Sequence, residues 1–220
     1  MLKKKQAGFV SWLILEDDDG NELGPHEEGN VVVKLPLPPG TLPTLYKDDN
    51  KFQSSYMTKF PGYYETSDGG YKDEDGYVFV MGRMDDVINI AGHRLSTGAM
   101  EEVVATHPSV AECAVFGTDD QLKGQLPIGL VVLKAGAEEN PDELQATLAK
   151  MVRSQIGPIA CYRETSIVAR LPKTRSGKIL RGTMRAISNG KEWRMPSTID
   201  DPASLDEITE SLKNMGYPKK

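Results

Sequence analysis

The pattern of apolar residues changes near the stretch 82–94, and this change limits the folds open to the chain. Before it, short apolar runs such as 9–15 and 29–35 end in clusters of acidic, glycine and proline residues, which is typical of strands separated by turns. After it, runs with helical spacing alternate with β-branched runs. The sequence therefore predicts a β-rich first part and a second part of mixed helices and strands.

The second part contains two helices with clear boundaries. Asn140 can cap a helix, Pro141 suits its first position, and the acidic Glu143 falls in its first turn. Apolar residues recur at helical spacing up to 156, and the Gly-Pro pair at 157–158 ends the helix. An earlier helix is expected between a cap at Ser96 or Thr97 and the His-Pro pair at 107–108.

The remaining elements of the second part complete a predicted α+β fold class. Strands are expected at 110–117, 128–133 and 165–169, a short basic helix at 179–188 and a last helix at 204–215. We expect three regions: a small β-rich region over 1–82, a compact mixed-sheet domain with flanking helices over 83–190, and a C-terminal tail with a short helix over 191–220.

Composition and charge disfavour several classes of protein. The chain has 220 residues, enough for one domain and part of a second, and its 39% hydrophobic and 26% charged residues are typical of globular proteins. A formal charge of -6 disfavours a nucleic-acid or anionic-membrane surface. No apolar run approaches the roughly 20 residues of a membrane span, and no signal-peptide core follows residues 1–5. We therefore expect no membrane span, and a cytosolic or organelle-matrix setting.

Two stretches concentrate charged residues in patterns that suggest chemistry. The stretch 82–94 holds two arginines, two adjacent acids and a Gly-His-Arg turn around a short β-branched run. The stretch 171–181 is a turn that brings Lys178 close to a helix start, where the helix dipole and the neighbouring Lys173, Arg175 and Arg181 repel it. A phosphate or carboxylate would relieve this repulsion, although a basic turn by itself is more often a solvated surface loop.

These two stretches resemble the interdomain linker and the C-terminal lysine motif of AMP-forming acyl-CoA synthetases, which belong to the adenylate-forming superfamily. The resemblance is nearest to the short-chain acetyl- and propionyl-CoA group, and it spans nearly the whole chain. The segments 121–125 and 156–158 stand at the family's spacing, and the tail over 195–202 leans towards the propionyl-CoA group. The region 1–82 would then be the last strands of the large N-terminal adenylating domain, and 83–190 the mobile C-terminal domain.

The resemblance implies a ligase that uses ATP, Mg²⁺ and coenzyme A. Such an enzyme converts a small carboxylic acid, here propionate or acetate, into an acyl-adenylate and then an acyl-CoA. The family's phosphate-binding loop, adenine motif and acyl pocket lie upstream and do not occur in this sequence. We therefore expect the chain alone to be inactive and its partner to be the missing N-terminal domain, with no nucleic acid involved. By analogy with family members, the setting is the mitochondrial matrix, with the cytoplasm as the alternative.

The resemblance assigns the adenylation step to four residues. Lys178 would be the catalytic lysine, and as an exposed amine it would also be an acetylation target. Asp68 and Arg83 would bind the ribose hydroxyls of ATP or AMP, although Asp68 alone reads as an ordinary turn aspartate. Asp85 falls on the hinge position. The family usually has Gly-Asp where this chain has Ser67 before Asp68.

The resemblance assigns a second group of residues to coenzyme A and to a cation. Ala91, Gly92 and Arg94 would face coenzyme A together with Arg153, which could equally be a solvated helix residue. The cation site would combine His107 with backbone oxygens, and a histidine before a proline at a helix end is more often a cap. The backbone oxygens would be those of Ala105 and Val110.

A different class of function remains open from the sequence. The chain could be a non-catalytic isoform or binding module whose basic residues hold an anionic ligand or a protein partner. Binding of nucleic acid by the same residues is disfavoured, because no aromatic residues are interleaved with them and the chain is acidic overall. The basic residues of this cluster are Lys173, Arg175, Lys178, Arg181 and Arg185.

Overall fold

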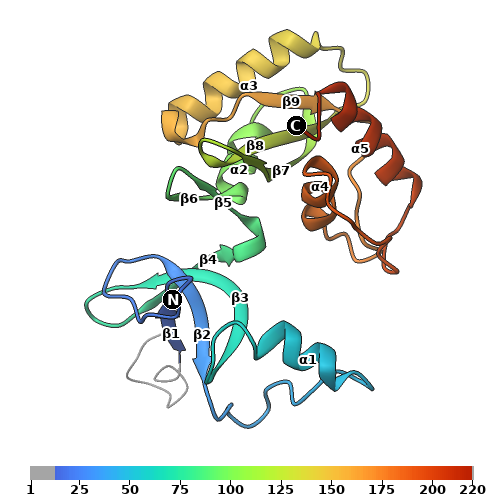
Figure 1. Ribbon diagram of the computed structural model, residues 1–220. Helices are drawn as coiled ribbons and strands as arrows, with labels where there is room; N and C mark the ends of the chain where they lie inside the picture. Colours follow the sequence, from blue (N-terminus) through green and yellow to red (C-terminus); the bar gives the residue numbers. More distant parts are fainter. Residues whose placement is uncertain (1–12, 220) are drawn as a thin grey trace. The chain divides into compact units, whose positions relative to one another are not determined.

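The computed structural model describes residues 13–219 and divides the chain into two compact units. The first unit ends at Met84 and the second begins at Asp85 (Figure 1). The expected strand at 9–15 lies partly outside the described residues, as does the segment 1–5. The predicted boundaries between regions, at 82–83 and 190–191, remain predictions.

The first unit is built on an antiparallel sheet of four strands in the order β1-β2-β3-β4. Short β-rich runs separated by turn residues produce this meander, in which every neighbouring pair of strands is antiparallel. The longest strand, β3, pairs with both β2 and β4 and carries irregular register on both sides. The strands are β1 (Leu13–Glu16), β2 (Gly29–Lys34), β3 (Tyr63–Lys72) and β4 (Val78–Arg83).

A helix, α1 (Asp49–Tyr56), interrupts this strand-rich unit, and its absence from the sequence-based expectation was an error. The side chain of Asp48 caps the helix by accepting a hydrogen bond from the backbone nitrogen of Lys51 at 3.1 Å. The helix buries only Phe52, so no apolar stripe at helical spacing was available to reveal it. The adjacent acids at 48 and 49 were the usable signal, since aspartate favours the cap and the first turn.

The second unit contains a mixed sheet, as predicted. Its strands run in the order β6-β5-β8-β7, and β9 pairs parallel with β8. The long β7–β8 hairpin supplies the centre, and the short β5–β6 hairpin joins at its open end through the pairing of Ile90 with Gly124. The strands are β5 (Val87–Ile90), β6 (His93–Ser96), β7 (Val110–Asp120), β8 (Gly124–Leu133) and β9 (Glu164–Ile167).

Helices pack against both faces of this sheet (Figure 1). On one face, α2 (Thr97–Ala105) and α3 (Pro141–Gln155) share an apolar cluster with Val115 and Val131. On the other, α4 (Arg181–Ser188) and α5 (Ala203–Asn214) share a cluster with Phe116 and Leu130. Neighbouring strand residues thus enter opposite clusters, as the two-residue period of a strand requires. The predicted α+β fold class is confirmed.

One close approach packs the segment between α3 and β9 against the sheet. A Cβ atom added to Gly129 on β8 would collide with the hydroxyl group of Tyr162, which is 4% exposed. Tyr162 also lies 2.8 Å from the hydroxyl of Thr165, so its polar end is satisfied inside the cluster. Glycine is therefore needed at position 129, because the Tyr162 ring occupies the space that a side chain would fill.

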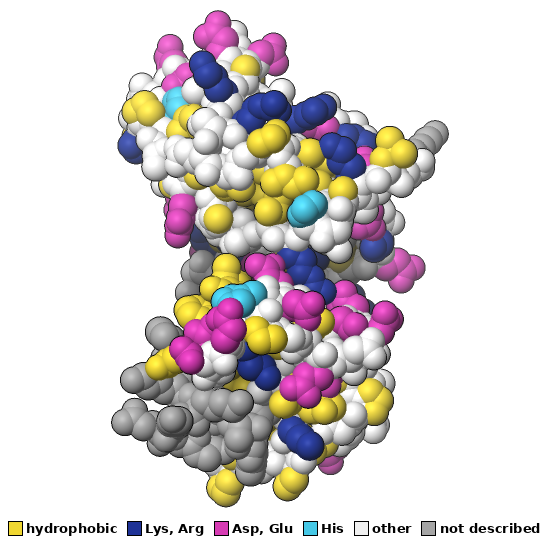
Figure 2. Space-filling model, turned by 90° about the vertical axis from the view of Figure 1, so that its left-hand side faces the viewer, with side chains coloured by type: hydrophobic (Ala, Val, Ile, Leu, Met, Phe, Trp, Pro, Cys, Tyr) yellow, Lys and Arg dark blue, Asp and Glu magenta, His cyan; other side chains and the backbone are white. Residues whose placement is uncertain are grey.

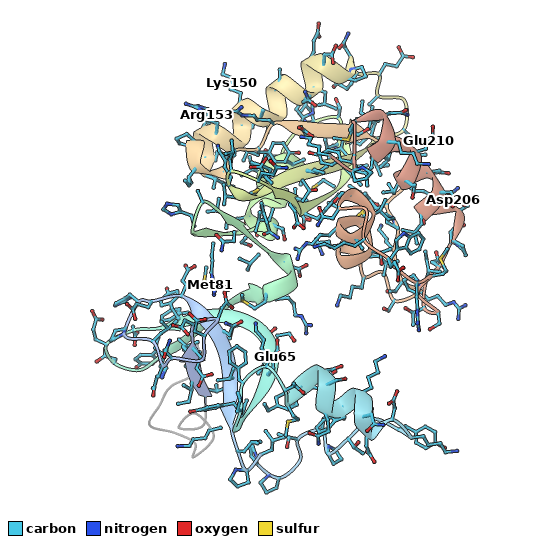
Figure 3. The ribbon with its side chains drawn as sticks, viewed as in Figure 1. Glu65, Met81, Lys150, Arg153, Asp206 and Glu210 are labelled. Carbon is cyan, nitrogen blue, oxygen red and sulfur yellow. The ribbon has the colours of Figure 1, made fainter. Side chains whose placement is uncertain are left out.

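Helix α5, within the C-terminal tail, contributes to the second unit's core. The inner face of α5 buries Leu205, Ile208 and Leu212, while Asp206 and Glu210 point outward (Figure 3). The short 3-10 turns η2 (Met84–Asp86) and η3 (Pro158–Ala160) complete the described elements. Within residues 13–219, no helix is both long enough and apolar enough to cross a membrane.

Candidate functional site

The loop that carries Lys178 is a tight hairpin held by backbone hydrogen bonds. Thr174 pairs with Lys178 through a 2.8 Å bond from its nitrogen to the lysine carbonyl, and its hydroxyl accepts from the nitrogen of Lys178 at 3.1 Å. Lys173 bridges Ile179, and Leu180 donates to the carbonyl of Pro172 at 3.0 Å. These bonds keep 179–180 extended, so α4 begins at Arg181 and not at the expected residue 179.

The Lys178 side chain is exposed at this hairpin. Within the described residues 13–219, its ammonium group has no hydrogen-bond or ion-pair partner. The lysine is therefore a mobile positive charge on a fixed backbone, suited to meeting an anion that comes from outside the unit.

Its basic neighbours, by contrast, are largely neutralised. The ammonium of Lys173 contacts both carboxylate oxygens of Glu112 at 2.7 Å. The guanidinium of Arg181 forms two 2.8 Å bonds to the carboxylate of Glu101 and lies 3.7 Å from Asp86. The five basic residues expected to form one anion-binding cluster thus do not present five available charges. This observation weakens the reading of the cluster as a broad anionic-partner surface.

The pair of Arg181 and Glu101 also joins the loop to the core. Their side chains are only 17% and 16% exposed, and Glu101 accepts a further 2.7 Å bond from the backbone nitrogen of Val115. A mostly buried ion pair keeps its place only when its remaining hydrogen-bonding groups are satisfied, as they are here. The residue at the start of α4 is therefore anchored to α2 and to β7.

The segment expected to face coenzyme A is the two-residue turn of the β5–β6 hairpin. Ala91 and Gly92 both adopt positive φ, at 51° and 87°, in the manner of a type I′ turn. The side chain of Asn89 accepts from the nitrogen of Gly92 at 3.0 Å, and the nitrogen of Ala91 donates to the carbonyl of Lys123 at 2.7 Å. Arg94 follows on β6, so the turn and the arginine form one edge, in which the turn is exposed and Arg94 is half-buried.

Arg153 lies at the end of α3, where it lines a cavity of about 250 Å³ with Lys150 and Arg163. Lys150 and Arg153 both lie on α3, about one turn apart (Figure 3). Figure 2 shows Lys and Arg side chains, in dark blue, gathered on one face of the second unit. Three cations around one small cavity favour an anionic group such as phosphate, and sequence reasoning had found only Arg153 among them.

The same cavity contains one of the two free cysteines. Cys161 lines it, and its sulfur lies 2.9 Å from the ammonium of Lys123, whose carbonyl supports the 91–92 turn. The other cysteine, Cys113, is different: burial and the nearby Glu101 carboxylate raise the pKa of its thiol to about 11. Burial likewise raises the pKa of the Tyr162 phenol above its ordinary value. Cys113 is therefore a packing residue, in agreement with the apolar run that surrounds it.

In the first unit, the two expected ribose-binding residues are direct cross-strand partners. Asp68 on β3 lies opposite Arg83 at the end of β4. Directly opposed residues bring their Cβ atoms to roughly 5 Å, close enough for both side chains to reach one diol. The strands thus bring together two residues that are 15 positions apart in the sequence.

The serine that replaces the family's usual glycine is strained. Ser67 has φ of 61°, in the left-handed region, inside a bulge where Val31 pairs with Asp68 but Val32 pairs with Glu65. Glycine adopts this conformation without steric cost. Hydrogen bonds from the Thr66 hydroxyl to Val31, and from the Asp68 nitrogen to that hydroxyl, hold the bulge in place.

The expected hinge and cation residues have more local surroundings. Asp85 lies in η2 and is the first residue of the second unit. At the end of α2, Nδ1 of His107 accepts a 3.3 Å bond from the nitrogen of Ser109, so the proton of the neutral ring is on Nε2 and this arrangement presents no ring lone pair to a metal. A search of the described residues finds no group of three His, Cys, Asp or Glu side chains placed to hold a metal. The set of His107 with carbonyls of Ala105 and Val110 is neutral, so Mg²⁺ there would keep several waters.

Comparison with known proteins identifies the domain. Residues 99–178 match the family model of the AMP-binding enzyme C-terminal domain, a match that ends at Lys178. The chain carries an AMP-binding enzyme C-terminal domain. This confirms the resemblance seen in the sequence.

Relatives of this chain include short-chain acyl-CoA synthetases. Mouse acyl-CoA synthetase short-chain family member 3, mitochondrial, is 49% identical, with 91% of this chain matching 30% of the relative. Propionate–CoA ligase of Escherichia coli K12 is 43% identical, with 91% of this chain matching 33% of the ligase. An uncharacterised protein of Pseudomonas aeruginosa is 55% identical, with 90% of this chain matching 31% of that protein. The chain thus spans about a third of each relative's length and corresponds to its C-terminal part.

A solved structure supports the same assignment. The amide bond synthetase McbA from Marinactinospora thermotolerans matches with a TM-score of 0.58 and 28% identity, covering 79% of this chain and 34% of that protein. The chain therefore shares its fold with part of a larger synthetase.

Proposed function

We propose that this chain is the C-terminal part of a short-chain acyl-CoA synthetase that activates propionate or acetate. The observation that carries the proposal is the exposed Lys178, whose ammonium has no partner among residues 13–219, on a hydrogen-bonded hairpin at the end of the match to the AMP-binding enzyme C-terminal domain. The homology to propionate–CoA ligase and to the mitochondrial short-chain synthetases favours propionate and a mitochondrial matrix setting, with the cytoplasm as the alternative.

In the first step, a carboxylate oxygen of the acid attacks the α-phosphorus of ATP. The bond from that phosphorus to the bridging oxygen breaks, and pyrophosphate leaves. Lys178 acts by placing a positive charge beside the oxygens on which negative charge accumulates. Asp68 accepts hydrogen bonds from the ribose hydroxyls, and Arg83 donates to the same oxygens. Mg²⁺ would enter with ATP, and acetylation of Lys178 would remove the charge that this step requires.

In the second step, the thiol of coenzyme A attacks the acyl carbonyl, and AMP leaves. Rotation at Asp85 would exchange the Lys178 hairpin for the 91–94 edge at the reacting centre. Arg94, with the backbone of Ala91 and Gly92, would line the path of the thiol-bearing arm. The cations at the end of α3, Arg153 and Lys150, would bind the phosphates of coenzyme A. A cation at His107 would have a structural role at the end of α2.

Complementation tests this proposal. Residues 1–220 would be joined to the part of the 55%-identical Pseudomonas relative that precedes the matched segment. We expect pyrophosphate release that depends on propionate, acetate or butyrate from the joined protein, and none from residues 1–220 alone. Loss of this activity in the Lys178→Ala variant, with wild-type folding retained, would support the catalytic role. A folded, joined protein that releases no pyrophosphate would favour the alternative of a binding module.

A further inference from the structure

The tail segment 198–200 lies directly against the Lys178 hairpin. The nitrogen of Arg175 donates to the carbonyl of Thr198 at 2.9 Å, and the nitrogen of Asp200 donates to the carbonyl of Lys173 at 2.9 Å. Ile199 forms a bridge with Thr174 between these two bonds. The hairpin therefore has a third extended segment beside it, supplied by residues that follow α4.

This segment is fixed from its own side as well. Ile199 is 5% exposed and belongs to the apolar cluster beneath α4 and α5. The next residue but one, Asp201, forms an ion pair with Arg170, whose guanidinium also contacts Glu207 of α5 at 2.6 Å. Arg170 immediately precedes the loop that leads into the hairpin. The core and an ion-pair network thus hold both ends of the contact.

We propose that Ile199 and the 198–200 backbone are positioning elements for Lys178. This inference rests on the proposed function. The lysine is exposed, and its ammonium has no hydrogen-bond or ion-pair partner within residues 13–219, so its position depends on the hairpin backbone. Without the tail segment, the hairpin keeps its internal bonds and the ion pair of Lys173 with Glu112, but loses its two backbone bonds to 198–200. The tail then acts mainly on the adenylation step, because the backbone of the 91–92 turn used in the second step is held by Asn89 and Lys123.

The first test is independent of activity. Trypsin cleavage after Arg175 and Lys178 in the 220-residue chain reports how often the hairpin opens. We expect Ile199→Ala to speed this cleavage about tenfold, because loosening the anchor weakens two backbone bonds together. Ile208→Ala is the matched control, since it removes the same atoms from the same cluster at a residue that is 0% exposed but lies in α5, outside the 198–200 segment that bonds to the hairpin. Equal cleavage rates in the two variants would overturn the proposal.

A second variant covers the case in which Ile199→Ala fails to fold. Asp200→Pro removes the nitrogen-bound hydrogen that Lys173 accepts, without opening a cavity, because Asp200 is exposed. Its control, Asp200→Ala, keeps that hydrogen. Faster cleavage in the proline variant only is expected, and unchanged cleavage in both would overturn the proposal.

The kinetic test uses the joined protein with the Pseudomonas relative. For Ile199→Ala, we expect the rate of acyl-adenylate formation to fall about tenfold with little change in KM for ATP or acid, while acyl-CoA formation from supplied acyl-adenylate changes less than twofold. Equal losses in both half-reactions, or the same losses in Ile208→Ala, would show a merely structural role. If Lys178→Ala retains full adenylation, the proposed function itself fails; if only Ile199→Ala does, this inference alone fails.

Discussion

The Lys178 hairpin and the 91–92 turn are both short and exposed, but they are held in different ways. The hairpin over 173–179 relies on backbone bonds to the tail segment 198–200, about 20 residues away in the sequence. The turn relies on its own Asn89 and on Lys123 of the adjoining β7–β8 hairpin. Each segment can therefore be disturbed without changing it directly: the hairpin through the tail, and the turn through Lys123 and its contact with Cys161.

The largest expected effect separates the two segments by chemistry. We expect Lys178→Ala to lower the rate of acyl-adenylate formation about 10²- to 10³-fold, the usual cost of removing one group that stabilises transition-state charge. Formation of acyl-CoA from supplied acyl-adenylate should be nearly unchanged. Rapid-quench measurement of each half-reaction in the joined protein checks this. Arg175→Ala is the control, as an exposed cation on the same hairpin, and equal losses in both variants would contradict the assignment.

The two cysteines offer a chemical probe of the turn. At pH 8, the pKa of about 11 leaves Cys113 with about a hundredfold less thiolate than an ordinary cysteine has. Iodoacetamide should therefore modify Cys161 first, which mass spectrometry of tryptic peptides can follow. Because Cys161 contacts Lys123, the modification should slow the second half-reaction and spare the first. Faster labelling of Cys113 would contradict the described burial.

A moderate effect is expected at the cavity beside the turn. Arg153→Ala should raise KM for coenzyme A about tenfold, as expected for one charge-assisted hydrogen bond to a phosphate. KM for ATP should not change. Lys213→Ala, an exposed cation on α5, is the matched control for loss of a surface charge. A similar rise in both variants would indicate a general effect of charge.

The smallest expected effect concerns the stability of the strained positions. Ser67→Gly should stabilise the folded chain by about 0.5–1 kcal/mol, because glycine tolerates the positive φ that serine holds at a cost. Ala91→Asn should act similarly in the turn, since type I′ turns favour Asn-Gly. Urea unfolding measures both changes. Ser197→Gly, at an exposed tail residue, provides the comparison. Equal stabilisation by this change would show that the positive φ of Ser67 is not the cause.

The sequence predicted the elements whose signals are local, and it missed those that depend on contacts. The Asn140 cap and the apolar period after it placed α3 to within a residue of its end at Gln155. The first turn of α4 was misplaced because Ile179 is drawn into a bridge with Lys173, a pairing that helix propensity does not encode. Helix α1 was missed because it buries a single side chain.

The candidate site divides in the same way. Lys178, Asp68 and Arg153 were identified through motifs, and the cross-strand placement of Asp68 beside Arg83 agrees with a shared ligand. The neutralisation of Lys173 and Arg181 could not be foreseen, because their carboxylate partners lie about 60 and 80 residues away. Nothing in the local sequence marked the contribution of Ile199, an apolar residue flanked by the polar residues Thr198 and Asp200.

The contact between Gly129 and Tyr162 has a consequence for how this domain can diverge. No side chain fits at position 129 while a tyrosine fills position 162, so a mutation at 129 alone is eliminated whatever its effect on chemistry. Loss of the tyrosine first would open that space and allow alanine or serine to follow. Related domains should therefore change at these two positions in a fixed order, with the smaller residue at 162 preceding the larger one at 129.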